Sequence, residues 1–229
     1  KISDKIPTVI ADKKAEVYAP IAVSSPTICD INHDNHKEIV VGGGNLKVTV
    51  TKSGQVNFDF ETVPGNVSVL DAVTGQILWK VQTASLGDEK TGETMVSSPA
   101  IADVNNDGYE DIALVTTKLW RFYYEQGTSN FVNTPVYTRN YLYLIDGRTH
   151  QPIAIEGGNK PSFSQRFFAY RLQNDPYTPY ILLPTSSPTI GDVNGDGSLE
   201  VVWGGIDGNL YTLYKSGNNN WRKWNVGFP

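Results

Sequence analysis

One acidic motif occurs three times in this 229-residue chain, and it constrains the fold more than any other feature. The third copy reads Asp192-Val193-Asn194-Gly195-Asp196-Gly197-Ser198-Leu199-Glu200, with oxygen-bearing side chains at its first, third, fifth and ninth positions. Equivalent copies begin at Asp103 and at Asp30. A Ser-Pro pair and a short apolar segment precede each copy, and a second apolar run follows it. A motif that recurs together with its flanks indicates repeated structural units.

The alternating oxygens of each copy predict a calcium site. Calcium prefers several oxygen ligands on a compact, flexible loop, and alternate side chains of such a loop point toward one centre. We expect about three calcium ions in a structural role, because one loop supplies nearly all the ligands of each ion. With the seventh residue of each copy added, the assigned sets are Asp30, Asn32, Asp34, His36 and Glu38; Asp103, Asn105, Asp107, Tyr109 and Asp111; and Asp192, Asn194, Asp196, Ser198 and Glu200.

The first copy departs slightly from the other two. Its sixth residue is Asn35, where the others have Gly108 and Gly197, although Asn also accepts the left-handed backbone that a sharp turn needs. It also carries two histidines, His33 and His36. We expect this loop to bind calcium least tightly.

An EF-hand begins with the same residues, but the rest of the motif excludes that reading. An EF-hand needs an acidic group at the twelfth position and a helix after it. Here the twelfth residues are Val41, Leu114 and Trp203, and runs rich in β-branched residues follow. The loops therefore lie between strands.

Each copy belongs to a unit of four short strands. In the first unit, Val67–Asp71 and Ile77–Val81 form a hairpin with Gly75 in its turn, and Lys14–Ile21 is a possible leading strand. Repeated four-stranded units predict an all-β β-propeller, with a solenoid of shorter, more uniform coils as the alternative. The whole chain, residues 1–229, is one propeller portion with blades at about 24–84, 97–156 and 186–229 and loop insertions at 51–65, 119–136 and 156–184.

These motifs resemble the FG-GAP/VCBS repeats of integrin-type propellers, which carry Asp-x-Asp/Asn-x-Asp-Gly-x-x-Asp/Glu between the first two strands of a blade. The resemblance implies a calcium-binding propeller. Propellers close with four to eight blades, and only three are visible in this sequence. The chain is then part of a larger propeller, one of several copies that complete a ring, or a truncated piece.

The long insertions are expected at the end of the molecule opposite the acidic loops. Long loops on a rigid scaffold commonly bind ligands, and these insertions are rich in aromatic residues with arginines nearby. The candidate ligand-binding residues are Trp120, Tyr123, Tyr124, Arg166, Phe167 and Tyr170. The alternative is that these aromatic residues only pack the insertions onto the blades.

Composition excludes some classes of protein. The net charge of −5 argues against a general nucleic-acid partner, and no apolar run reaches the length of about 18 residues that a membrane helix needs. The single cysteine, Cys29, cannot form an internal disulfide and is expected to be buried. Weak calcium loops fill where calcium is abundant, which favours an extracellular or cell-surface location.

Together these features favour an extracellular binding or adhesion module for a protein or polysaccharide ligand. A calcium-dependent polysaccharide lyase, with Lys118 or Arg166 as proton acceptor, is the second reading, and a structural spacer is the third. The sequence offers an enzyme little else, because two of its three histidines lie in an acidic loop and its recurrent serines belong to the repeat.

Overall fold

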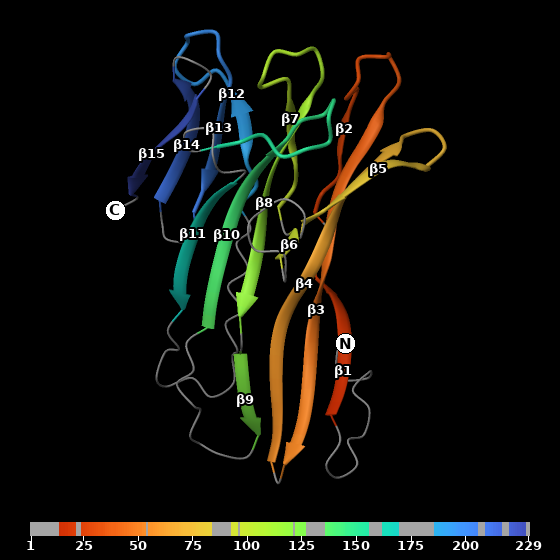
Figure 1. Cartoon of the computed structure of the whole chain (residues 1–229), viewed down its shortest axis with the longest axis vertical. Helices are drawn as coiled ribbons and strands as arrows, with labels where there is room; N and C mark the ends of the chain where they lie inside the picture. Colours follow the sequence, from red (N-terminus) through yellow and green to blue (C-terminus); the bar gives the residue numbers. More distant parts are fainter. Residues whose placement is uncertain are drawn as a thin grey trace.

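The computed structural model describes residues 14–21, 24–53, 55–83, 93–95, 97–120, 122–126, 136–155, 162–169, 186–205, 209–216 and 220–227. In these residues the chain is all-β, which confirms the predicted fold class, and the strands form three antiparallel sheets. No helix in this part of the chain is long and apolar enough to cross a membrane. The sheets lie in a row, with the three acidic loops at the same end (Figure 1).

The first sheet contains the predicted meander, lengthened by a long ribbon. Strands β2 (Thr27–Cys29), β3 (Glu38–Ser53), β4 (Gln55–Asp71) and β5 (Ile77–Gln82) are neighbours in this order. The outer halves of β3 and β4 extend away from the acidic loop, where β1 (Lys14–Ile21) pairs with β3 and β9 (Phe122–Gln126) pairs with β4.

The interpretation of residues 51–65 as a loop insertion is therefore wrong. Thr51 pairs with Asn57 and Thr49 with Asp59, so the segment continues both strands of the ribbon. Polar and apolar residues alternate along it, and that period of two is typical of a strand. Insertion 119–136 likewise contains strand residues, because β8 runs to Trp120 and β9 follows it.

The second sheet is built around β8 (Asp111–Trp120) and β10 (Val136–Ile145). Strands β7 (Ala100–Ala102) and β6 (Glu93–Met95) pair with β8, and β11 (Ser162–Ala169) pairs with β10. Residues 152–155, where a unit of four strands would need its last strand, form isolated bridges, including one between Ile145 and Pro152. Proline has no N–H to donate to a ladder, which limits pairing at that point.

The third sheet is a four-stranded meander as predicted. Its order is β12 (Thr189–Gly191), β13 (Glu200–Gly204), β14 (Asn209–Ser216) and β15 (Asn220–Gly227). All its neighbouring strands are antiparallel.

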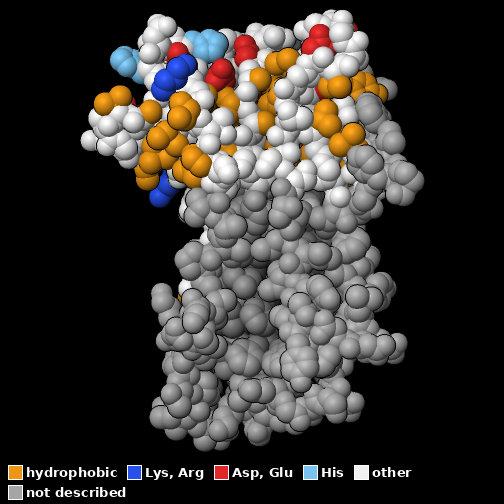
Figure 2. All heavy atoms as spheres, turned by 180° about the vertical axis from the view of Figure 1, so that it is seen from behind, with side chains coloured by type: hydrophobic (Ala, Val, Ile, Leu, Met, Phe, Trp, Pro, Cys, Tyr) orange, Lys and Arg blue, Asp and Glu red, His pale blue; other side chains and the backbone are white. Residues whose placement is uncertain are grey.

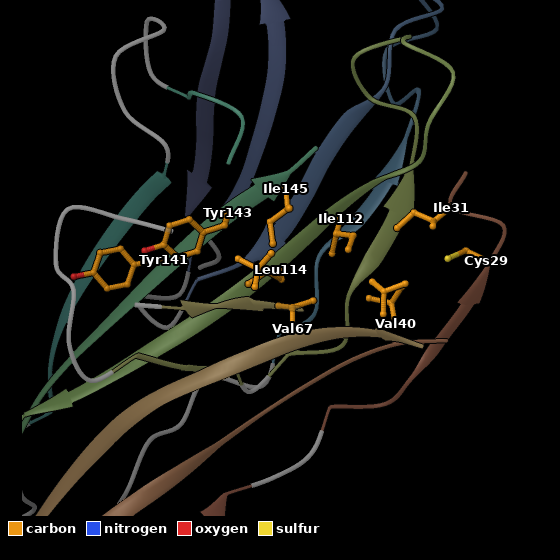
Figure 3. Packing of buried hydrophobic residues seen from close by; sticks show 11 residues of the cluster. Cys29, Ile31, Val40, Val67, Ile112, Leu114, Tyr141, Tyr143 and Ile145 are labelled. Atoms are coloured by element: carbon orange, nitrogen blue, oxygen red, sulfur yellow. The ribbon is translucent and has the colours of Figure 1, made fainter. Parts of the chain in front are cut away.

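Two hydrophobic clusters join the sheets face to face. We call the side of a sheet that is turned toward the next sheet its forward face, and the opposite side its rear face. Figure 3 shows the first cluster, in which the forward face of the first sheet meets the rear face of the second, with Val40 and Val67 opposite Ile112 and Leu114. The second cluster joins the forward face of the second sheet to the rear face of the third. The described residues form a row of three sheets and do not close it into a ring.

Cys29 lies in the first cluster with 8% of its surface exposed, which confirms its predicted burial. Burial raises the pKa of its thiol to about 12. The side chain therefore acts as a small packing residue.

Candidate metal loops

The three acidic loops share one hydrogen-bond scheme. The first residue of each loop is an aspartate whose two oxygens accept the N–H groups of the fifth and sixth residues, at 2.9 to 3.1 Å. The third residue is an asparagine whose oxygen also accepts the fifth N–H, at 2.8 to 3.1 Å. These contacts turn the side chains at the first and third positions toward the inside of the loop.

The side chain of the fifth residue is the third one that turns toward the inside of each loop. The carboxylates of Asp34, Asp107 and Asp196 each accept the N–H of the seventh residue, at 2.8 to 3.0 Å. The hydrogen bonds from the seventh-residue N–H groups of His36 and Ser198 lower the pKa values of Asp34 and Asp196. Both carboxylates therefore stay ionised, as cation ligands must.

The loops need left-handed backbone at two positions. The predicted one is the sixth, where φ is 68° at Asn35, 88° at Gly108 and 86° at Gly197. The fourth position is also left-handed, at His33, Asn106 and Gly195. The spacing of the acidic residues did not predict this second turn, although Asn106 and Gly195 are of residue types that accept such a backbone.

The ninth carboxylate has a supporting role that the sequence did not reveal. Glu38, Asp111 and Glu200 are 2%, 0% and 2% exposed, and each accepts the N–H of the second loop residue at 2.8 to 3.1 Å. A buried carboxylate at the base of the loop thus closes the loop onto the strand that follows it.

The second loop is bonded to the hairpin turn of its own sheet through side chains. Asp111 accepts the N–H of Gly147 through its second oxygen, and the Asn105 amide donates to Asp146 at 3.1 Å. Burial raises the pKa of Asp111 to about 7, although the N–H groups of Gly147 and Val104 oppose that shift. Asp146 also accepts N–H groups in its own hairpin turn, as Asp71 does in the first sheet, and neither residue belongs to the ligand sets predicted from the sequence.

The donor chemistry of the loops fits a hard cation. The sets offer oxygen donors and no sulfur, and His36 is the only member whose side chain would have to coordinate through nitrogen. In the described part of the chain, no three Asp, Glu, His or Cys side chains gather into a metal-holding group, and each ninth carboxylate accepts an N–H at the base of its loop. The inward donors of each loop are the two carboxylates and one amide at positions one, three and five.

The described candidate ligand-binding residues lie on β8, β9 and β11, away from the acidic loops (Figure 1). Trp120 pairs with Tyr137 between β8 and β10, and Arg166 and Phe167 lie on β11. Tyr123 and Tyr124 lie on β9, which pairs with β4 of the first sheet. The structure thus divides these residues between two sheets, and Tyr170 lies outside the described residues.

Acidic side chains are visible at the loop end of the molecule in Figure 2.

No protein-family model, curated protein or solved structure matches the chain.

Proposed function

We propose that this chain is a calcium-stabilised portion of a β-propeller of the FG-GAP/VCBS type, acting outside the cell as a binding or adhesion module for a protein or polysaccharide. The observation that carries the proposal is the common hydrogen-bond scheme of the three loops. Chance acidic turns would not repeat the same inward contacts at the same positions in three units.

The loops are built to hold a cation with little rearrangement. Their backbone N–H groups already fix the carboxylates at positions one and five, and the buried ninth residue fixes the loop to its sheet. The residues that would hold calcium are those at positions one, three and five, with the seventh and ninth residues completing each set. Bound calcium would supply positive charge that neutralises carboxylates held close together.

Two features of the fold support the propeller. The first and third sheets contain a four-stranded meander, and in all three units the acidic loop joins the first two strands. The sheets also stack face to face through apolar side chains, as propeller blades do.

The ligand is proposed to bind at the end of the molecule opposite the acidic loops, where β9 and the outer halves of β3 and β4 lie. This end is remote from the acidic loops, so calcium would support the scaffold and leave binding to the candidate aromatic residues and Arg166 (Figure 1). Tyr and Trp suit a surface where a flat apolar face meets polar groups, and arginine suits carboxylates.

A binding panel tests this proposal. Acidic polysaccharides, neutral polysaccharides and cell-surface proteins are titrated with the chain in calcium and in chelator. We expect an acidic ligand to bind in calcium and to lose affinity with Arg166→Glu, whereas Lys215→Glu on β14 serves as the matched control and keeps the affinity. Absence of binding across the panel contradicts the proposal, and release of unsaturated sugars from a polyuronide would instead support the lyase.

A further inference from the structure

Directional hydrogen bonds join the Ser-Pro segments of neighbouring sheets. The N–H of Ser25 donates to the hydroxyl oxygen of Ser98 at 3.1 Å, and the N–H of Ser98 donates to the hydroxyl oxygen of Ser187 at 2.9 Å. The Thr27 hydroxyl donates to the carbonyl oxygen of Pro99 at 2.8 Å. In each of these three Ser-Pro contacts the earlier sheet donates and the later sheet accepts.

This direction leaves unused groups at the two ends of the row. Thr189 in the third sheet occupies the position that Thr27 occupies in the first. Within the described residues, the Ser187 N–H and the Thr189 hydroxyl have no acceptor, and no N–H donates to the hydroxyl oxygen of Ser25. The last sheet therefore keeps the donors, and the first sheet keeps the matching acceptor positions at Ser25 and Pro26.

The rear face of the first sheet is an uncovered copy of a face that the other sheets bury. Ile39 and Leu70 are half-buried, and Ile28 is 69% exposed. At the positions equivalent to Ile39 and Leu70, the second and third sheets place residues that are 0% exposed, namely Ile112, Val201, Ile145 and Leu213. Figure 2 shows hydrophobic side chains gathered at the left, over the first sheet.

The Ser-Pro prolines follow the same order. Pro26 is exposed, whereas Pro99 and Pro188 are buried. Among the described residues, the first sheet has no preceding sheet, and its proline is the exposed one.

The forward face of the third sheet is covered only in part, with Thr212 2% exposed but two apolar neighbours less well buried. Val202 and Leu210 are half-buried. Their equivalents on the forward faces of the first two sheets are at most 1% exposed, namely Val40, Ala113, Val67 and Leu142.

We propose that two copies of this chain pair head to tail, with the forward face of the third sheet of each copy packed on the rear face of the first sheet of the other. The Ser187 N–H then donates to Ser25 and the Thr189 hydroxyl donates to Pro26 across the interface, as their equivalents do within the chain. Two such contacts join six sheets, a number within the range of four to eight at which propellers close. The inference rests on the stacking of the sheets and requires neither calcium nor a ligand.

At the centre of the proposed interface, the side chain is smaller than the equivalent side chains between the sheets of one chain. Ser68 occupies the position of Tyr143 and Tyr211 on the rear faces of the later sheets. We therefore expect a pair that dissociates on dilution.

Sedimentation velocity over a range of concentrations tests the proposal. We expect the mass to rise to twice the 25.2 kDa of one chain and to stop there. Ile28→Glu and Thr189→Glu should each prevent pairing, and Val73→Glu, at a turn residue that is 88% exposed, is the control that pairs normally. Circular dichroism and bound calcium should match those of the unmodified chain, which separates this inference from the proposed calcium sites.

Mixing the two defective variants gives the sharpest readout. The Thr189→Glu variant keeps an intact first sheet, and the Ile28→Glu variant keeps an intact third sheet. A head-to-tail contact can form between these two intact sheets, so the mixture should recover pairs that neither variant forms alone. A monomer at every concentration, pairs that survive both substitutions, growth beyond two chains or a mixture that stays monomeric would each overturn the proposal.

Discussion

At the scale of single residues, the loop carboxylates can be tested one by one. Asp196 accepts the Ser198 N–H at 2.8 Å and is exposed to solvent. We expect Asp196→Ala to lose one calcium ion while the other two loops keep theirs, because each loop supplies its own donors. Metal analysis of dialysed protein measures this. Glu16→Ala, which removes a carboxylate paired with Lys47 outside the loops, is the control that retains every ion. An unchanged metal content for the Asp196 variant would refute the ligand assignment.

The left-handed turn at Gly197 allows a second residue-scale prediction. Its φ is 86°, and an added Cβ would meet no atom within 4 Å, so only the backbone conformation opposes a side chain there. We expect Gly197→Ala to lower the free energy of unfolding by about 1–2 kcal/mol in calcium-free buffer. Gly191→Ala is matched, since that site is equally open and lacks a left-handed φ, and it should be close to neutral. Denaturant titrations of both variants decide the point, and equal losses would contradict this explanation.

The inward direction of the loop side chains could be predicted from the sequence, whereas the contacts that attach the loops to the sheets could not. Alternating oxygens at Asp192, Asn194 and Asp196 are local features, so their shared inward direction follows from spacing alone. The burial of Glu200 and the link from Asn105 to Asp146 depend on packing between segments distant in the chain. Spacing within one loop carries no information about such contacts.

At the scale of elements, the sheet centres were predicted and the β3–β4 ribbon was not. Residues such as Asp59 and Glu61 suggested a loop by their polarity, yet they alternate with Phe58 and Phe60 as strand residues do. Periodicity was the better guide here. The stacking order of the sheets could not be predicted, because it depends on which faces meet in space.

One contact between elements should respond to pH. Trp79 of the first sheet stacks on His150 of the second, with ring centroids 4.1 Å apart and planes at 16°. Burial lowers the pKa of His150 below its usual 6.5, and nearby Asp146 opposes the shift. The neutral imidazole is therefore favoured in the folded chain, so this contribution to stability is complete above pH 6.5 and is lost as the pH falls through and below that value.

Thermal unfolding at a series of pH values measures this effect. We expect the melting temperature to fall on acidification, and His150→Gln should remove part of that fall. His33→Gln with His36→Gln is the control, because both of these exposed imidazoles lie in the first acidic loop and should leave this part of the fall in place. A pH profile unchanged by His150→Gln would show that the stack does not couple the two sheets.

At the scale of the whole molecule, negative charge is concentrated at one end. Nine of the 24 Asp and Glu residues lie at ligand positions in the three loops, three in each. The loops share one end of the row of sheets (Figure 1), so their carboxylates repel one another when no cation is bound. Three bound divalent ions would change the formal net charge from −5 to +1. Calcium is therefore expected to act on the stability of the scaffold as a whole.

Removing calcium tests that expectation. A ligand that binds only the folded state at a concentration of 100 times its Kd stabilises that state by about 2.7 kcal/mol per site, so three occupied loops represent a large share of the stability of a domain. We expect chelator to lower the melting temperature by roughly ten degrees or more, and added calcium to restore it. Sodium chloride at matched ionic strength is the control, because it screens repulsion without coordinating the loop oxygens and should restore only part of the loss. A melt unaffected by chelator, or fully restored by sodium chloride, would mean that the inward carboxylates stabilise the chain through their backbone hydrogen bonds alone.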